Sequence, residues 1–102
     1  MNLFEGIPAL LADERVDTLH SAGELRIERI VSAAHASPAE FWYDQEQDEW
    51  VIVLRGAARL QFEAEMVEMR AGDYLHIPAH RRHRVDWTSP DEQTIWLAVF
   101  YG

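Results

Sequence analysis

The segment Ala71–Trp87, AGDYLHIPAHRRHRVDW, decides the fold of this chain. Its Gly72-Asp73 pair predicts a turn, and Tyr74–Ile77 predicts a short strand. Pro78 ends that strand, because proline has no backbone N–H to donate to a neighbouring strand. A short loop then leads into a second strand, so the segment indicates two strands joined by a loop.

The second of these strands, residues 83–87, carries a histidine on its apolar face. Successive side chains of a strand point to opposite faces, so His83, Val85 and Trp87 are expected on one face and the charged residues between them on the other. Because Val85 and Trp87 are apolar, this alternation predicts that His83 points into the interior with them. An imidazole in that position is either a hydrogen-bonded core residue or a ligand.

The rest of the chain repeats this pattern of short strands and turn signals. We expect a single domain over residues 1–102, with an irregular lead-in at 1–14 that contains one helical turn after Pro8 and a body of strands at 15–102. Alternating or continuously apolar runs predict eight strands, at 15–19, 24–31, 50–54, 57–63, 66–69, 74–77, 83–87 and 94–101. With no long amphipathic helix, this pattern predicts an all-β sandwich or barrel.

Composition excludes several classes of function. The chain has 18 acidic and 9 basic residues and a net charge of −9, which disfavours nucleic acid and anionic membranes as partners. It has no cysteine, which excludes disulfides, thiolate metal ligands and a cysteine nucleophile. No apolar run approaches the ~20 residues of a membrane span, and no signal-peptide pattern opens the chain. We therefore expect a cytoplasmic protein.

Two predicted strands, 50–54 and 95–101, are apolar on both faces. Such strands are covered on both sides in folded proteins. Either the N-terminal segment or a second subunit must cover the outer apolar surface. We expect a homodimer.

The Ala71–Trp87 segment also resembles the second sequence motif of the cupins, which runs Gly, five residues, Pro, one residue, Gly, two residues, His, three residues, Asn. Gly72, Pro78 and His83 fall on their motif positions. His80 stands in place of the second glycine, and Trp87 stands in place of the asparagine. The segment is similar to this motif at three of its five positions.

The first cupin motif runs His-x-His, three or four residues, Glu, six residues, Gly, and it matches in part. Glu49 and Gly56 have the motif's separation, whereas Tyr43 and Gln45 occupy the two histidine positions. Over residues 41–87 the chain thus resembles a small single-domain cupin. The resemblance implies a jelly-roll barrel, the double-stranded β-helix, with one open mouth.

The resemblance also implies a divalent metal, because cupins typically bind one with two histidines and a glutamate of the first motif and a histidine of the second. Carried over by position, Glu49 and His83 remain as ligands for an Fe, Mn, Zn or Ni ion. The amide of Gln45 is a weaker donor, and the protonated phenol of Tyr43 barely binds a metal. If the loop brings His80 to them, Glu49, His83 and His80 form the two-histidine, one-carboxylate set of non-haem iron oxygenases.

The same residues can instead form an organic ligand pocket. The motif positions of Tyr43 and Trp87 face the barrel interior in cupins, and Gln45 would add a polar group between such walls. His76 is either a hydrogen-bonded or exposed strand residue or a further member of this pocket.

Glu49 and His83 carry the chemistry in either case. Apolar surroundings raise the pKa of a carboxyl such as Glu49, and a raised carboxyl beside an imidazole is a plausible acid–base pair. Three functions stay open: a metal-dependent enzyme acting on a small molecule, such as an oxygenase, isomerase or decarboxylase; a metal-free barrel that binds a small ligand, as a sensor or sequestering module; or a structural pair inside a stable dimer.

Overall fold

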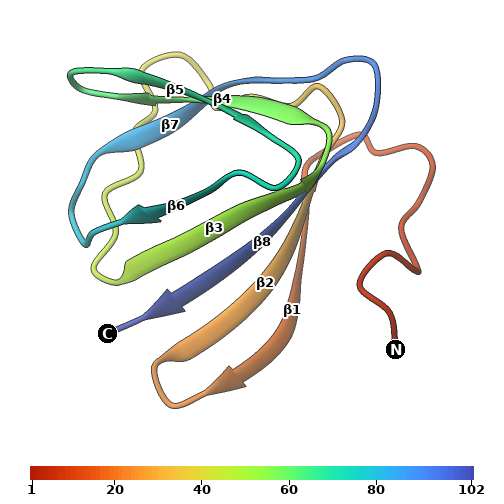
Figure 1. The fold of residues 1–102 in the computed structure, drawn as a ribbon, viewed down its shortest axis with the longest axis horizontal. Helices are drawn as coiled ribbons and strands as arrows, with labels where there is room; N and C mark the ends of the chain where they lie inside the picture. Colours follow the sequence, from red (N-terminus) through yellow and green to blue (C-terminus); the bar gives the residue numbers. More distant parts are fainter.

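Eight β-strands and no helix make up the fold (Figure 1). The computed structural model describes residues 1–102. The strands are β1 (Arg15–Ala22), β2 (Leu25–Ser32), β3 (Asp48–Arg55), β4 (Ala57–Phe62), β5 (Met66–Arg70), β6 (Tyr74–Ile77), β7 (His83–Thr88) and β8 (Thr94–Tyr101). The expected all-β fold is confirmed, whereas the helical turn expected after Pro8 is wrong, since residues 1–14 form only turns, bends and extended chain.

The strands form two antiparallel sheets that face each other. The larger sheet has the order β1-β2-β8-β3-β6 and the smaller one the order β5-β4-β7. Neighbours in both sheets are often distant in sequence, as in the pairs β2–β8, β3–β6 and β4–β7. In Figure 1 the three-stranded sheet lies above the five-stranded one, and the chain crosses between them several times. This arrangement is a jelly-roll barrel.

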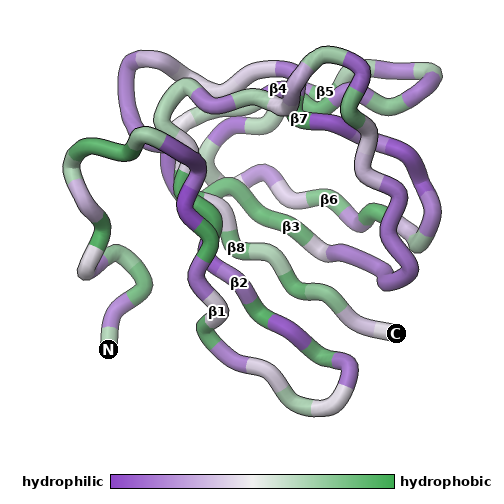
Figure 2. Tube along the Cα trace, turned by 180° about the vertical axis from the view of Figure 1, so that it is seen from behind, coloured by the Kyte–Doolittle hydropathy of each residue, from purple (hydrophilic) through white to green (hydrophobic).

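The hydrophobic core lies between the two sheets. It forms because every second side chain of a strand points to the same face. The inner face of β3 contributes Val51 and Val53, and β4 contributes Leu60 and Phe62 from the opposite sheet. Figure 2 shows β3 and β8 as the most hydrophobic strands, while hydrophobic and hydrophilic residues alternate along β2. The apolar runs of the sequence thus become the central strands of the larger sheet, and the alternating runs lie nearer its edge.

Strand β7 contains a β-bulge that changes which side chains face the core. Arg59 pairs with Trp87, but the next residue, Leu60, pairs with Val85, so Asp86 is an extra residue on β7. A one-residue slip moves a side chain to the other face of a sheet. Val85 therefore lines the interior, whereas Trp87 lies on the outer face and is 37% exposed. The strict alternation that predicted an inward Trp87 was wrong at this point.

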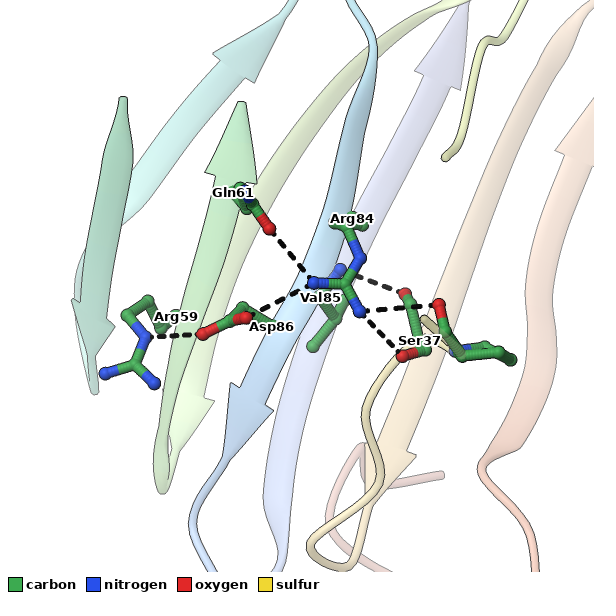
Figure 3. A network of polar contacts seen from close by, with 7 residues as sticks. Ser37, Arg59, Gln61, Arg84, Val85 and Asp86 are labelled. Atoms are coloured by element: carbon green, nitrogen blue, oxygen red, sulfur yellow. Dashed lines mark hydrogen bonds and ion pairs between the residues drawn. The ribbon is translucent and has the colours of Figure 1, made fainter. Parts of the chain in front are cut away.

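Ion pairs and hydrogen bonds hold the bulge (Figure 3). The Asp86 carboxylate accepts hydrogen bonds from Arg59 Nε at 2.8 Å and from Arg84 Nη1 at 3.2 Å. Arg84 also donates to Gln61 Oε1 at 3.0 Å and to the backbone carbonyl of Ser37 at 2.9 Å. Arg84 thereby fixes the loop after β2 against β7, and this loop continues into one wall of the site.

The N-terminal segment packs against the edge of the larger sheet through a buried arginine. Arg29 Nη1 donates to the carbonyls of Leu3 at 2.9 Å and Glu5 at 2.8 Å, and its Nη2 pairs with Asp17 at 2.7 Å. This contact covers part of the outer face near β1 and β2. No helix of the structure is long and apolar enough to cross a membrane.

Candidate functional site

A cavity of about 800 Å³ lies between the two sheets. Its apolar wall includes Val51, Leu60, Ile77, Val85 and Trp96, which come from five strands of both sheets. Its polar groups include Gln45, Glu49 and His83. Apolar walls with a few convergent polar groups are typical of small-molecule sites.

Glu49 and His83 reach this cavity from opposite sheets. Glu49 lies on β3, where Ile77 and Phe100 are its neighbours across the sheet, and His83 begins β7 opposite Phe62. Their side chains are only 9% and 6% exposed, and Glu49 Oε1 lies 3.7 Å from His83 Nε2. The two β-segments thus deliver a carboxyl and an imidazole into one interior, as their positions in the sequence predicted.

The hydrogen bond of its other ring nitrogen fixes the tautomer of His83. Nδ1 lies 2.9 Å from the backbone carbonyl oxygen of Arg81. A carbonyl oxygen only accepts hydrogen bonds, so Nδ1 carries the proton and donates it. In the neutral ring, Nε2 is then an acceptor. It faces Glu49 but makes no hydrogen bond.

Burial shifts the pKa of three groups of the cavity, Glu49, His83 and Tyr43. Desolvation raises the pKa of Glu49 to about 7, against the smaller opposing effect of a 3.4 Å hydrogen bond from Gln45 Nε2. Desolvation lowers the pKa of His83, partly offset by the hydrogen bond to Arg81, so its neutral form is favoured. The pKa of the Tyr43 phenol is raised, first by burial and then by the charges of Glu14 and Glu49. Near neutral pH burial thus shifts both groups toward their uncharged forms.

Tyr43 and Gln45 form the loop wall of the cavity. Tyr43 and His83 exchange two backbone hydrogen bonds, and their rings stack with centroids 5.3 Å apart. The Gln45 carbonyl accepts a hydrogen bond from the backbone N–H of His80 at 2.7 Å. Both predicted pocket residues therefore line the cavity beside Glu49.

Three other predicted site residues lie outside it. His80 is exposed, has a φ of 64°, and its Nδ1 pairs with Asp44 Oδ1 at 2.7 Å. His76 is also exposed, and its Nε2 pairs with Asp48 Oδ2 at 3.1 Å. Neither imidazole lines the cavity, and Trp87 is turned away by the bulge. The loop after Pro78 takes His80 outward, which corrects the expectation that it would join His83.

Sequence reasoning missed the cavity residues on β2. Arg26, Glu28 and Ile30 line the cavity, and Arg26 Nε pairs with Glu28 Oε2 at 2.8 Å. The Arg26 guanidinium also lies 4.4 Å from the ring centroid of Phe100. The apolar neighbours Leu25 and Ile27 suggested that the charged face of this strand pointed to solvent. The available signal was Ile30, which shares a face with Arg26 and Glu28.

The side chains present do not fit the metal of the cupin motif. Of the four residues at the motif's ligand positions, only Glu49 and His83 offer a good donor to the cavity, because Gln45 turns its amide N–H₂ toward Glu49 and Tyr43 carries a phenol. No group of three or more His, Cys, Asp or Glu side chains comes together anywhere in the chain. Two donors fall short of the three protein ligands that a catalytic zinc or non-haem iron site uses.

Comparisons with known proteins agree with the fold. The cupin domain family matches residues 29–100. A crystal structure from Ralstonia eutropha, named "putative mannose-6-phosphate isomerase", is 49% identical with a TM-score of 0.95, over 98% of this chain and 94% of that one. A search of curated proteins found no match.

Two more distant structures share the fold. A cupin superfamily protein of Desulfitobacterium hafniense is 18% identical with a TM-score of 0.77, over 92% of this chain and 82% of that one. The cupin domain of a transcriptional regulator from Enterobacter cloacae is 12% identical with a TM-score of 0.72, over 87% and 96% of the two chains. The family match over most of the barrel and the two-sheet jelly roll lead to one conclusion: this chain belongs to the cupin domain family.

Proposed function

We propose that this cupin binds a small organic molecule in its cavity through Glu49 and His83, without a resident metal. One observation carries the proposal. Glu49 and His83 are both more than nine-tenths buried, yet Glu49 Oε2 and His83 Nε2 bond to no other group of the chain and are not among its fully enclosed unpaired atoms, which are Arg29 Nε and Arg84 Nε. Both atoms are therefore accessible from the cavity that the two side chains line, and a bound molecule can supply the hydrogen bonds that the chain leaves open.

A purely structural role for the pair is less well supported. At 3.7 Å, Glu49 Oε1 and His83 Nε2 are too far apart for a hydrogen bond. A pair kept only for stability would be expected to bond directly, whereas these two groups leave their remaining atoms open to the cavity. A ligand that enters the cavity can bond to both groups.

The metal-free form of the proposal rests on the donor set. Tyr43 and Gln45 occupy the two positions at which the cupin motif has histidine, and His80 lies outside the cavity. We therefore expect protein purified without an affinity tag to contain less than about 0.1 metal per chain by elemental analysis, since two donors bind a divalent ion weakly. A stoichiometric metal that is lost in His83→Gln would overturn this part of the proposal.

A melting-temperature screen tests the binding itself. A molecule that binds only the folded state raises the melting temperature by mass action. We expect a hit from a library of small amines, acids, sugars and phenols to lose its effect in Glu49→Ala, which removes the polar group altogether, and to keep it in Glu92→Ala, a matched change at an exposed position outside the cavity. No hit, or hits insensitive to Glu49→Ala, would contradict the proposal.

A second candidate is an acid–base enzyme at the same site. Its support is the pKa of Glu49, about 7, beside a neutral imidazole; the name of the Ralstonia relative adds isomerisation as a reaction to test. In such a reaction the Glu49 carboxylate would take a proton from the carbon beside a carbonyl and return it to the neighbouring carbon. His83 would move a proton between the two oxygens, with no net redox change.

Deuterium exchange separates the two candidates. In heavy water, an enzyme of this kind would incorporate deuterium at the carbon beside the carbonyl of its substrate. Glu49→Gln would abolish this exchange. Binding without exchange would leave the metal-free binding function and exclude the acid–base one for the molecule tested. Aldose and ketose sugars, with and without phosphate, are the first compounds to assay.

A further inference from the structure

The cavity has a strongly unequal balance of charge. One guanidinium, that of Arg26, shares the lining with five carboxyl groups, of which Glu28 and Glu49 are at least half-buried and Glu14, Glu24 and Glu46 are exposed. The only other basic group in the wall is His83, whose burial favours its neutral form. A ligand entering this cavity therefore meets mostly negative charge.

The single cation of the cavity is already engaged. Arg26 Nε bonds to Glu28 Oε2 at 2.8 Å, and the same guanidinium lies over the ring of Phe100. All nine basic residues of the chain are arginine, and no lysine is present to supply a mobile ammonium group. The all-β fold also has no helix N-terminus, which is the common backbone site for phosphate. The cavity thus lacks a free group suited to a phosphate or sulfate.

The two buried polar side chains also present acceptors to the cavity. Nδ1 of His83 carries the ring proton and bonds to Arg81, so Nε2 can only accept while the ring is neutral. The Glu49 carboxylate accepts when ionised, and the amide N–H₂ of Gln45 is directed at it. A complementary ligand must bring hydrogen-bond donors, and an ammonium group brings three donors together with a positive charge.

The position of Arg26 shows how the wall accommodates a cation. Its guanidinium lies between a carboxylate, Glu28, and an aromatic face, Phe100. Tyr43 and Glu49 line the same cavity next to His83, since the Tyr43 ring stacks on the imidazole and Glu49 Oε1 lies 3.7 Å from Nε2. Carboxylate and aromatic groups around one position are the chemistry that recognises organic cations.

We propose that the cavity selects small molecules carrying a primary ammonium or a similar hydrogen-bond-donating cation, and that it discriminates against phosphorylated molecules. This inference rests on the proposed binding function and specifies its ligand class. The isomerase candidate, if correct, then concerns an amine-bearing or neutral carbonyl compound rather than a sugar phosphate.

Two series of matched probes test the inference by calorimetry on the full chain. One consists of benzylamine, benzyl alcohol and benzyl phosphate, and the other of glucosamine, glucose and glucose 6-phosphate. Within each series the carbon skeleton stays the same, while the charge of the compound changes from positive to neutral to negative. We expect the amine of at least one series to bind about tenfold or more tightly than its phosphate, and addition of salt to weaken it.

Two variants test whether Glu49 is the group that recognises the amine. Glu49→Gln should lower the affinity for the amine about tenfold while changing that for the neutral alcohol or sugar little, because an amide still accepts a hydrogen bond. Glu92→Gln, the same change outside the cavity, should leave both affinities unaltered. The melting temperature of each variant establishes that it is folded.

The outcomes separate the two levels of the proposal. If the phosphate or the neutral member binds as tightly as the amine, the cation inference is wrong and the binding function stands. If amine affinity survives Glu49→Gln, the inferred recognition by this carboxylate is wrong. If no member of either series binds, the inference fails, and the melting-temperature screen then decides whether the binding function fails with it.

Discussion

Burial acts in opposite directions on the two polar side chains of the cavity. It raises the pKa of Glu49 and lowers that of His83, since in each case the charged form is the one that loses hydration. The two groups therefore approach neutrality together rather than forming a fixed ion pair. A site of this kind keeps both members available for a ligand, which a salt-bridged pair would not.

The raised pKa of Glu49 predicts a specific dependence of stability on pH. The folded state binds the Glu49 proton up to about pH 7, whereas the unfolded state releases it near 4.5. Stability contributed by the protonated group is therefore lost as pH rises between these values, by about 3 kcal/mol in total. Glu49→Gln should remove this loss, so its advantage over the wild type in urea unfolding should be larger at pH 8 than at pH 5.

The pH dependence of wild-type stability does not isolate Glu49, because the lowered pKa of His83 changes stability with pH in the opposite direction. The difference in unfolding free energy between Glu49→Gln and the wild type isolates it. The lowered pKa of His83 means that its contribution is present above the unfolded value of 6.5 and is lost as pH falls through the folded pKa. The wild-type curve contains both effects. An equal difference at the two pH values would mean that Glu49 is not desolvated in the folded protein.

At the scale of the elements, the turn between β3 and β4 joins the strand that carries Glu49 to the strand that pairs with β7, which carries His83. Gly56 has a φ of +86°, and a Cβ atom built on it would lie 2.5 Å from Thr94 Oγ1 and 2.7 Å from Thr94 Cα. The second contact is with backbone, which cannot move aside cheaply. Gly56 therefore joins β3 to β4 at a close approach to the start of β8.

Two glycine variants separate this contact from backbone strain. Gly56→Ala should lower the free energy of unfolding by about 2–4 kcal/mol, from strain and overpacking together. Gly72→Ala has a similar φ, +94°, with open space around its Cβ, so it should cost only about 1 kcal/mol. Denaturant unfolding of both variants measures the difference, and equal losses would contradict the close approach at Gly56.

The strands were predictable because each keeps the period of two over most of its length, and turn residues mark where each one ends. The predicted direction of individual side chains was wrong where a bulge breaks this alternation, or where both faces of a strand carry polar as well as apolar residues. The bulge at Asp86 reverses Trp87, and it depends on ion pairs with Arg59 and Arg84 that no local pattern reveals. Strand β2 has mixed faces: Arg26 lines the cavity, while the apolar Ile27 pairs with Val99 on the other face.

The candidate site was predictable to the same extent. His83 comes from a predicted strand and was placed in the interior by alternation, whereas Glu49 precedes the predicted strand 50–54 and was placed there by the resemblance to the first cupin motif. His80 comes from a loop, where a positive φ and a bond to Asp44 decide its direction. Sequence spacing carries no information on such a loop conformation.

At the scale of the whole molecule, the outer face of the larger sheet remains apolar. Trp50 pairs with Val99, and Ile52 pairs with Leu97, on the face away from the cavity. The N-terminal segment contacts this sheet through Arg29, nearer its other edge. We propose that a second copy of the chain covers the remainder, giving the homodimer expected from the sequence.

Substitution at this face should produce monomers. Val99→Glu introduces a charge at its centre, so light scattering should give the mass of one 11.8-kDa chain where the wild type gives twice that mass. Met66→Glu makes the same kind of change on an exposed residue of the smaller sheet and should remain dimeric. A monomeric wild type, or a dimer that survives Val99→Glu, would contradict this assembly.

The most direct test of the binding site is the state of the His83 ring, read by long-range ¹H–¹⁵N correlation spectra at pH 7. We expect a neutral ring with its proton on Nδ1 and a free Nε2, unchanged by chelator and shifted by the amine that binds in the calorimetric series. A proton on Nε2, or a ring signal that changes when chelator removes a metal, would contradict this expectation.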